Sequence, residues 1–177
     1  RQALRWSLQE CAISVTKGAM MTRLTLIAAL FWIILDQASK WIMLLVLDLD
    51  RVGQVLVMPP YLNFIMGWNR GINFGLFANS PDLLRYGLIA LALAVSACMI
   101  LLGRNSQSKL SAIAAGSVAG GALGNAFDRL YHGAVVDFLN MSCCGINNPY
   151  TFNIADIGIF AGVFGLLLFS NDEKPKV

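Results

Sequence analysis

Ionisable side chains inside apolar stretches are the residues of this sequence with types and spacing suited to chemistry. Five of them lie within long apolar segments: Asp36, Lys40, Asp128, Arg129 and Asp156. Asp137 follows the third such segment by a few residues. An ionisable side chain in a membrane span costs about 2.5–3.5 kcal/mol on insertion scales, so by default it marks a functional site. Because the second apolar segment brings none of these groups, we expect the other three to share one site.

Asp137 and Asp156 differ from the other acids because neither has a Lys or Arg within four residues. Both are flanked by apolar side chains. Two carboxylates brought close together in a low dielectric cannot both ionise easily, so one keeps its proton. Such a pair can activate a water with one acid and protonate a leaving group with the other. The spacing alone leaves a second interpretation open, in which the two are unrelated capping or pore-lining acids.

The remaining charged residues fall at helical spacing. Asp36 and Lys40 are at i and i+4 with the acid first, the favourable order for an ion pair on one helix face, and the simplest role of that pair is to hold helices together. Asn125 and Arg129 repeat the spacing, with Asp128 on the adjacent flank. Arg129 therefore either holds Asp128 or binds an anionic group of a lipid or substrate.

The composition indicates an integral membrane protein of one domain. Of the 177 residues, 57% are apolar (AVILMFWYC) and only 13% are charged, with a mean hydropathy of +0.65. Soluble domains carry about 25% charged residues, so a soluble enzyme is excluded, and disorder requires the opposite composition. A net charge of +3 is too small to suggest a nucleic-acid partner. Four cysteines without a CxxC pair indicate neither a disulfide scaffold nor zinc.

Four segments are long and apolar enough to be membrane helices, at about 24–47, 83–102, 110–130 and 152–169. Eight Lys and Arg residues lie in the N-terminal flank, the loop between the second and third helices, and the tail at 172–177. This bias predicts that both termini are cytoplasmic and that the two longer loops face outward. We expect a membrane domain at 21–171. Residues 1–20 form an N-terminal extension, interpreted as either a cytoplasmic segment or upstream reading frame.

The outward loops and the glycines indicate how the helices are connected and packed. Residues 48–80 alternate apolar and polar side chains between glycines and prolines, which predicts short strands in a small sheet. The loop at 131–151 ends in a turn signal, Asn147–Pro149. Glycines recur every four residues in the third and fourth helices: Gly116, Gly120, Gly124, Gly158 and Gly162. Such faces allow close packing, which would bring Asp128, Asp137 and Asp156 together.

Five short blocks occur in order along the chain: Asp36–Lys40, Asn69–Gly75, Gly124–Arg129, Val135–Phe138 and Phe152–Asp156. With four apolar helices, they make residues 22–170 resemble the lipoprotein signal peptidase (signal peptidase II) family. The resemblance implies an all-α, multi-pass protein of the bacterial inner membrane with a small extracytoplasmic β-sheet after the first helix. It also implies an aspartic endopeptidase that cleaves prolipoproteins N-terminal to a diacylglyceryl-modified cysteine, near the outer face.

Carried over block by block, the resemblance makes Asp137 and Asp156 the catalytic acids. Residues expected to bind substrate or support the site are Asp36, Lys40, Asn69, Gly71, Gly121, Asn125, Asp128, Arg129, Asn153 and Ala155. No metal or other cofactor is expected. The partners implied are lipid-modified prolipoproteins and membrane lipids, and the enzyme is expected to act as a monomer. His132, the single histidine, is interpreted as a loop residue and not a base.

The sequence departs from the family pattern at two places. Ile72 and Asn73 stand where the family's loop motif has small residues, which affects substrate fit at that loop. Cys143 and Cys144 are not part of the family pattern, and they are either free thiols or bonded elsewhere. From the residues alone, a small proton-coupled carrier or an anchoring subunit remains an alternative. The carrier interpretation is weakened because no internal repeat occurs and the polar groups gather at one face of the membrane.

Overall fold

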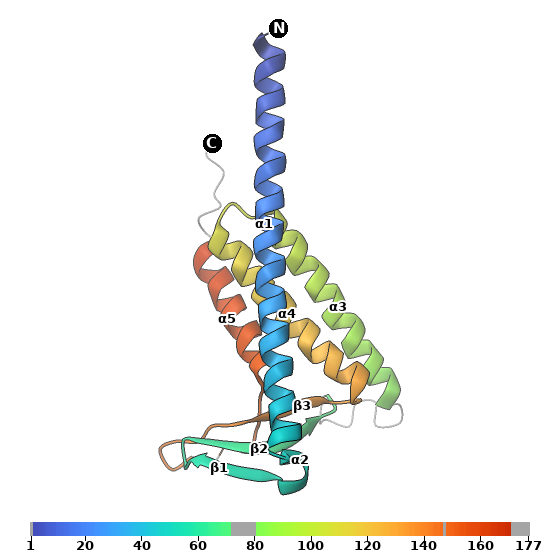
Figure 1. Ribbon diagram of the computed structural model, residues 1–177, viewed down its shortest axis with the longest axis vertical. Coiled ribbons are helices and arrows are strands. Elements are labelled where there is room, and N and C mark those ends of the chain that lie inside the picture. The colour runs from blue at the N-terminus through green and yellow to red at the C-terminus, as the bar shows by residue number, and fades with distance from the viewer. Residues whose placement is uncertain (1, 72–80, 147, 171–177) are drawn as a thin grey trace.

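Four long helices and a three-stranded sheet make up the part of the chain that the structure, a computed structural model, describes: residues 2–71, 81–146 and 148–170. The helices extend to one side of the sheet (Figure 1). In chain order the elements are α1 (Gln2–Trp41), the π-helical turn η1 (Ile42–Val46), α2 (Leu49–Val52), β1 (Gln54–Met58), β2 (Leu62–Asn69), α3 (Pro81–Asn105), α4 (Lys109–Tyr131), β3 (Val135–Asn140) and α5 (Ile154–Phe169).

Three of the helical segments are long and apolar enough to cross a membrane: Val15–Val46, Asp82–Asn105 and Lys109–Tyr131. The fourth, α5, is an apolar helix of 16 residues. The four expected helices therefore exist as helices, and the bounds of the last three lie within three residues of those expected. At its N-terminal side α1 runs without a break through residue 20.

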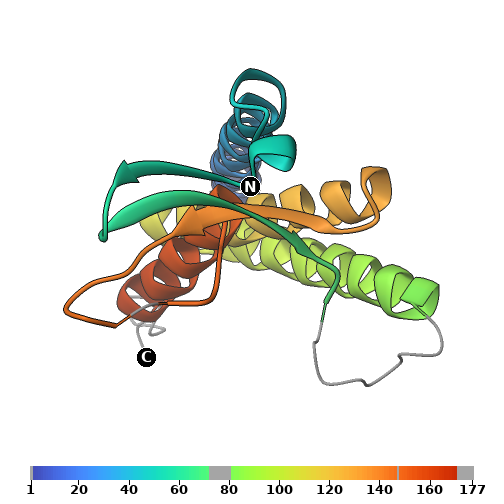
Figure 2. The same ribbon diagram turned by 90° about the horizontal axis from the view of Figure 1, so that it is seen from below.

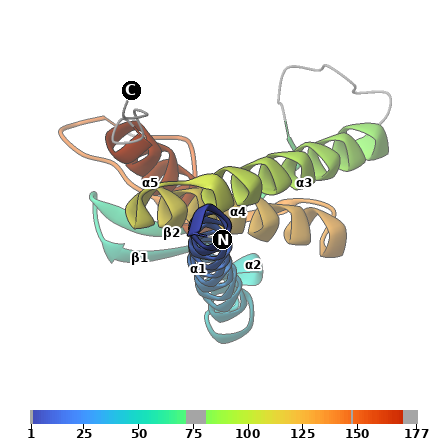
Figure 3. The same ribbon diagram turned by 90° about the horizontal axis from the view of Figure 1, so that it is seen from above.

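Helix α4 is the centre of the bundle and contacts α1, α3 and α5 (Figures 1 and 3). Its small residues explain this position, because a Cβ at Gly116 or Gly120 would collide with Thr25, Ala28 or Ala29 of α1. The glycine stripe of α4 therefore packs against α1. The close packing of α4 and α5 that the spacing predicted is confirmed, and it uses Gly121 and Gly162.

The sheet is antiparallel in the order β1-β2-β3 and lies across one end of the helices (Figures 1 and 2). Strands β1 and β2 confirm the strands expected in residues 48–80. Residues 72–80 of that segment lie outside the described part of the chain. Strand β3 was not expected. On one of its faces Val136 and Phe138 form an apolar core with Met43 of η1 and Leu49 of α2. The alternation of a strand turns Asp137 to the opposite face.

Candidate active site

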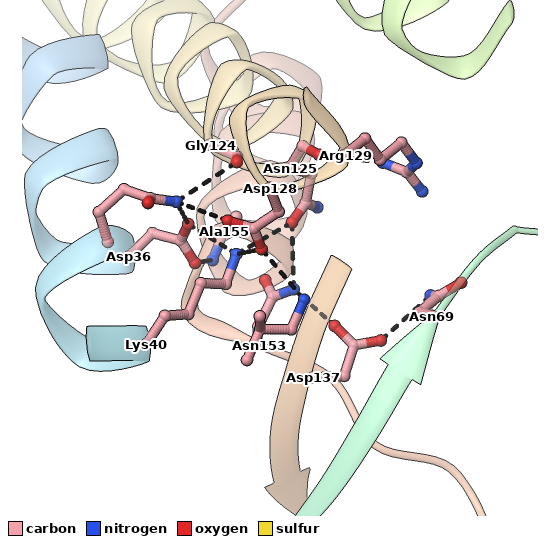
Figure 4. A network of polar contacts seen from close by, with 12 residues as sticks. Asp36, Lys40, Asn69, Gly124, Asn125, Asp128, Arg129, Asp137, Asn153 and Ala155 are labelled. Carbon is pink, nitrogen blue, oxygen red and sulfur yellow. Dashed lines mark hydrogen bonds and ion pairs between the residues drawn. The ribbon is translucent and has the colours of Figure 1, made fainter. Parts of the chain in front are cut away.

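Lys40 is the centre of a buried charge cluster between α1 and α4 (Figure 4). Its Nζ lies 2.8 Å from Asp36 Oδ2 and 2.7 Å from Asp128 Oδ2. It also donates to Asn125 Oδ1 at 3.3 Å. The ion pair expected between Asp36 and Lys40 is confirmed. The alternative in which Arg129 holds Asp128 is wrong, since Lys40 from another helix occupies that role.

The same cluster ties the sheet and α5 to the bundle. Asp36 Oδ1 accepts from the backbone N–H of Ala155, in the first turn of α5, at 2.9 Å. Asp128 Oδ2 accepts from the backbone N–H of Val136, in β3, at 3.1 Å. Asp36, Lys40 and Asp128 are 0%, 2% and 1% exposed. The three charges therefore have to satisfy one another and these backbone groups, because no solvent reaches them.

Gln37 belongs to this cluster and had no role in the sequence analysis beyond its place in the first block. Its amide donates to Asp128 Oδ1 at 2.8 Å and to Asp36 Oδ2 at 3.2 Å. It thus bridges the two carboxylates that share Lys40. Its position directly after Asp36 was the one sign of a role in the sequence. That position does not predict that the side chain reaches Asp128 on α4.

Asp137 lies on β3, buried between β2 and the start of α5. Each of its oxygens accepts one amide hydrogen: Asn69 Nδ2 is 3.1 Å from Oδ2, and Asn153 Nδ2 is 2.6 Å from Oδ1. Burial raises the pKa of Asp137 from its ordinary 3.8 to about 6, and the nearby charge of Asp156 adds to the increase, while the hydrogen bonds from Asn69 and Asn153 and the charge of Lys40 oppose it. Asp137 can therefore exchange a proton near neutral pH.

Asp156 is fixed in the first turn of α5 by a reciprocal cap. Asn153 is the N-cap: its Oδ1 accepts from the Asp156 N–H at 3.0 Å, and its own N–H donates to Asp156 Oδ2 at 3.1 Å. The other oxygen, Asp156 Oδ1, accepts from Asn125 Nδ2 at 2.9 Å. This is a capping box, in which the N-cap residue and the third residue of the helix each satisfy a backbone N–H of the other.

Two asparagines connect the two candidate catalytic acids. Asn153 Nδ2, which donates to Asp137 (Figure 4), also lies 3.1 Å from Asn125 Oδ1, and Asn125 donates to Asp156. Within the described part of the chain, neither acid forms an ion pair. The resemblance-based assignments thus meet in one network, in which neutral amides contact Asp137 and Asp156 while Lys40 contacts Asp36 and Asp128.

Small residues allow these elements to approach one another. A Cβ at Gly124 would lie 2.7 Å from Asp36 Oδ2 and 3.6 Å from the Cβ of Ala155. A Cβ at Gly121 would collide with Ile159 of α5 at 2.8 Å. Gly71 has φ +122°, and its N–H donates to Asn69 Oδ1 at 3.0 Å, which orients the asparagine toward Asp137. Ile72 and Asn73, where the loop motif departs from the family, lie outside the described residues.

Arg129 and the cysteines lie at the margin of the network. Arg129 Nη1 donates to the carbonyl oxygen of Asn125 at 3.3 Å, and its buried Nε has no hydrogen-bond partner. Figure 4 shows this side chain directed away from Lys40. Cys143 and Cys144 are exposed free thiols. The described residues contain no group of three or more His, Cys, Asp or Glu side chains that could hold a metal ion.

Comparisons with known proteins agree on one family. The family model for signal peptidase (SPase) II matches residues 28–171. The lipoprotein signal peptidase of Methylorubrum extorquens (strain PA1) is 42% identical, over 85% of this chain and 87% of that protein. That of Methylobacterium radiotolerans is also 42% identical, over 84% and 85%.

A solved structure has a similar fold. It is a bacterial membrane enzyme determined by the in meso method at 2.3 Å resolution, which superposes with a TM-score of 0.67 at 26% identity, covering 86% of this chain and 93% of that one. The family match over residues 28–171 and the two relatives at 42% identity show that this chain belongs to the signal peptidase II family of membrane peptidases.

Proposed function

We propose that the protein is an aspartic endopeptidase that removes the signal peptide of bacterial prolipoproteins, cleaving N-terminal to a diacylglyceryl-modified cysteine. Family membership supports the peptidase activity and the lipoprotein substrate. One observation carries the aspartic mechanism: Asp137 and Asp156 are bridged by Asn153 and Asn125, and no cation of the described residues forms an ion pair with either. Two acids brought together without a paired cation can share one proton.

The reaction follows from that pair. A water between Asp137 and Asp156 loses a proton to the ionised acid as its oxygen attacks the scissile carbonyl carbon. The protonated acid donates a hydrogen bond to the carbonyl oxygen, which carries the developing negative charge of the tetrahedral intermediate. When the C–N bond breaks, the proton taken from the water passes to the departing amine. The products are a new carboxyl terminus and a free amine on the lipidated cysteine.

The surrounding amides orient the acids without fixing their charge. Asn69 and Asn153 donate to opposite oxygens of Asp137, and Asn125 and the Asn153 backbone do the same for Asp156. A cation in their place would hold both acids ionised and remove the proton that hydrogen-bonds the carbonyl oxygen in the tetrahedral intermediate. In the described part of the chain, the Lys40 cluster forms no ion pair with the two acids. It supports them, because Asp36 and Asp128 hold the first turn of α5 and strand β3 in position.

The membrane placement that supports this chemistry has four spans, with α5 as the fourth. Its 16 residues extend about 24 Å, somewhat less than a hydrocarbon core of about 30 Å. The acids, the N-terminus of α5 and the sheet lie at the same end of the bundle, which we place at the outer face of the inner membrane with both termini cytoplasmic. A site at one end, and not at the midplane, favours a peptidase over a carrier. We assign residues 21–171 to the peptidase unit, acting as a monomer.

The decisive experiment offers the purified protein, in detergent, two forms of one prolipoprotein. One carries the diacylglyceryl group on its cysteine and the other does not, and cleavage is followed by gel shift. We expect cleavage only of the modified form, with a new N-terminus at the lipidated cysteine. Cleavage of both forms alike would overturn the assigned substrate, and cleavage of neither by folded protein would overturn the function.

A further inference from the structure

Four rings from three elements meet beside the site and form what we call the aromatic clasp: Trp41, Trp68, Tyr131 and His132. His132 is in contact with each of the others. Its ring centroid lies 4.8 Å from that of Tyr131, 5.6 Å from Trp68 and 6.1 Å from Trp41. Rings at such distances and inclined angles attract one another beyond the area they bury. The clasp therefore holds the end of α1, the end of α4 and strand β2 together.

Each element in the clasp also delivers a polar residue to the site. Trp41 directly follows Lys40, at the end of α1. His132 follows the last turn of α4, and its N–H donates to the carbonyl oxygen of Asp128 at 2.7 Å. Trp68 directly precedes Asn69, the last residue of β2. Because neighbouring side chains of a strand point to opposite faces, a contact that holds Trp68 on one face fixes the direction of Asn69 on the other.

Asn69 is the residue that needs such support. It is at the very end of β2, and its side-chain amide is one of only two hydrogen-bond donors to the Asp137 carboxylate in the described residues. Trp68 is anchored on its other edge as well, since its Nε1 donates to Asp50 Oδ1 at 2.9 Å. His132 and Asp50 thus hold the indole from two sides.

We propose that His132 is a positioning residue for the peptidase reaction: through its contact with Trp68 it holds the Asn69 amide against Asp137. This rests on the proposed function, because Asp137 is the acid whose proton the contact controls. A small displacement of a group that orients a reacting acid can lower the rate by about 10²-fold. His132 itself takes no part in the chemistry.

Loss of the Asn69 hydrogen bond raises the pKa of Asp137. Charged groups act on this acid from each element packed around it: Asp156 of α5, Lys40 of α1 and Arg129 of α4. The Asn69 hydrogen bond lowers the pKa of Asp137 and is the largest influence opposing burial. When Asn69 moves away, these charged groups stay, so the pKa of Asp137 rises above its present value of about 6.

The test compares His132→Ala with His132→Phe, and uses Asn69→Ala as the reference. Phenylalanine keeps a ring against Trp68 but removes the imidazole nitrogens, so it separates ring contact from imidazole chemistry. We expect His132→Ala to lower kcat about 10- to 100-fold with a smaller change in KM. It should also move the limb of the pH–rate profile that reports Asp137 to higher pH, toward that of Asn69→Ala. His132→Phe should recover most of the activity and the limb.

A titration of Asp137 without substrate tests the role of His132 independently of peptidase activity. In protein labelled with ¹³C at aspartate carboxyls, the NMR titration of Asp137 should shift to higher pH in His132→Ala and Asn69→Ala, and not in His132→Phe. In addition, the double variant His132→Ala/Asn69→Ala should lose no more activity than Asn69→Ala alone. An unchanged Asp137 titration in His132→Ala, or fully additive losses, would overturn the positioning role even if the enzyme cleaves prolipoproteins as proposed.

Discussion

The molecule contains two pairs of aspartates within one network, and they are stabilised in different ways. Asp36 and Asp128 share Lys40, at 2.8 and 2.7 Å, and are almost completely buried. Among the described residues, the hydrogen-bond donors to Asp137 and Asp156 are side-chain amides and one backbone N–H. The first pair is the kind of buried ion cluster that fixes a structure, since each charge has a partner. In the second pair, hydrogen bonds orient the carboxyl groups, but no cation is paired with them in the described residues.

This difference shows how a small membrane protein can keep an acid reactive. Removing a carboxylate from water favours its protonated form, and a neighbouring cation opposes that preference. Burial raises the pKa of Asp137 to about 6, and the buried Lys40 pairs with Asp36 and Asp128 but not with Asp137. The two pairs are nevertheless connected: Asn125 contacts Lys40 on one side and Asp156 on the other. Substitutions that affect one pair but not the other therefore test the division of roles.

The largest effect is expected on activity when one acid of the second pair is replaced. Asp137→Asn or Asp156→Asn should lower kcat at least about 1,000-fold, because general acid–base catalysis is lost while the side-chain shape is kept. Cleavage of a lipid-modified prolipoprotein by gel shift measures this. The matched control is Asp48→Asn, an exposed aspartate paired only loosely with Arg51 at 3.9 Å, which should keep normal activity. Substantial turnover by either site variant would contradict the assignment of the dyad.

The next largest effect is on stability, when the first pair loses its cation. Lys40→Met should lower the free energy of unfolding by about 3–5 kcal/mol, because two buried carboxylates lose their shared partner. Thermal unfolding in detergent measures it, and the exposed Arg51→Met is the control, with a change near zero. Activity should decline along with stability. Lost activity at unchanged stability would instead place Lys40 in substrate contact or chemistry, and the contrast between the two pairs would fail.

The sequence predicted the local parts of this arrangement. The Asp36–Lys40 pair follows from helical spacing, and the helices follow from long apolar runs whose length the membrane dictates. Asp137 and Asp156 could be singled out because no cation is near them in sequence. Their roles, and those of Asn69, Asn125 and Asn153, came from resemblance to a family; spacing alone did not exclude unrelated acids.

The parts that sequence could not provide depend on contacts between distant segments. Asp128 has Arg129 beside it in sequence, yet it pairs with Lys40, because the tight α1–α4 contact at Gly120 and Gly124 brings Lys40 within reach. Regular glycine spacing indicates close packing, but not which helix is the partner. Strand β3 was missed because both of its faces are covered, so Val135–Asn140 lacks the alternation that marks a half-exposed strand.

The smallest predicted effect is a pH dependence of stability that comes from Asp137. In the folded protein the pKa of Asp137 is about 6, against an ordinary 3.8. A raised pKa means that the stabilising contribution of this acid is fully present below pH 3.8 and is lost as the pH rises through 6. Wild type should therefore lose at most about 3 kcal/mol relative to Asp137→Asn between pH 4 and pH 8. Unfolding in detergent at both pH values measures the difference. A gap between wild type and Asp137→Asn that stays constant with pH would mean that burial does not perturb Asp137, and that its amide contacts do not leave it able to exchange a proton near neutral pH.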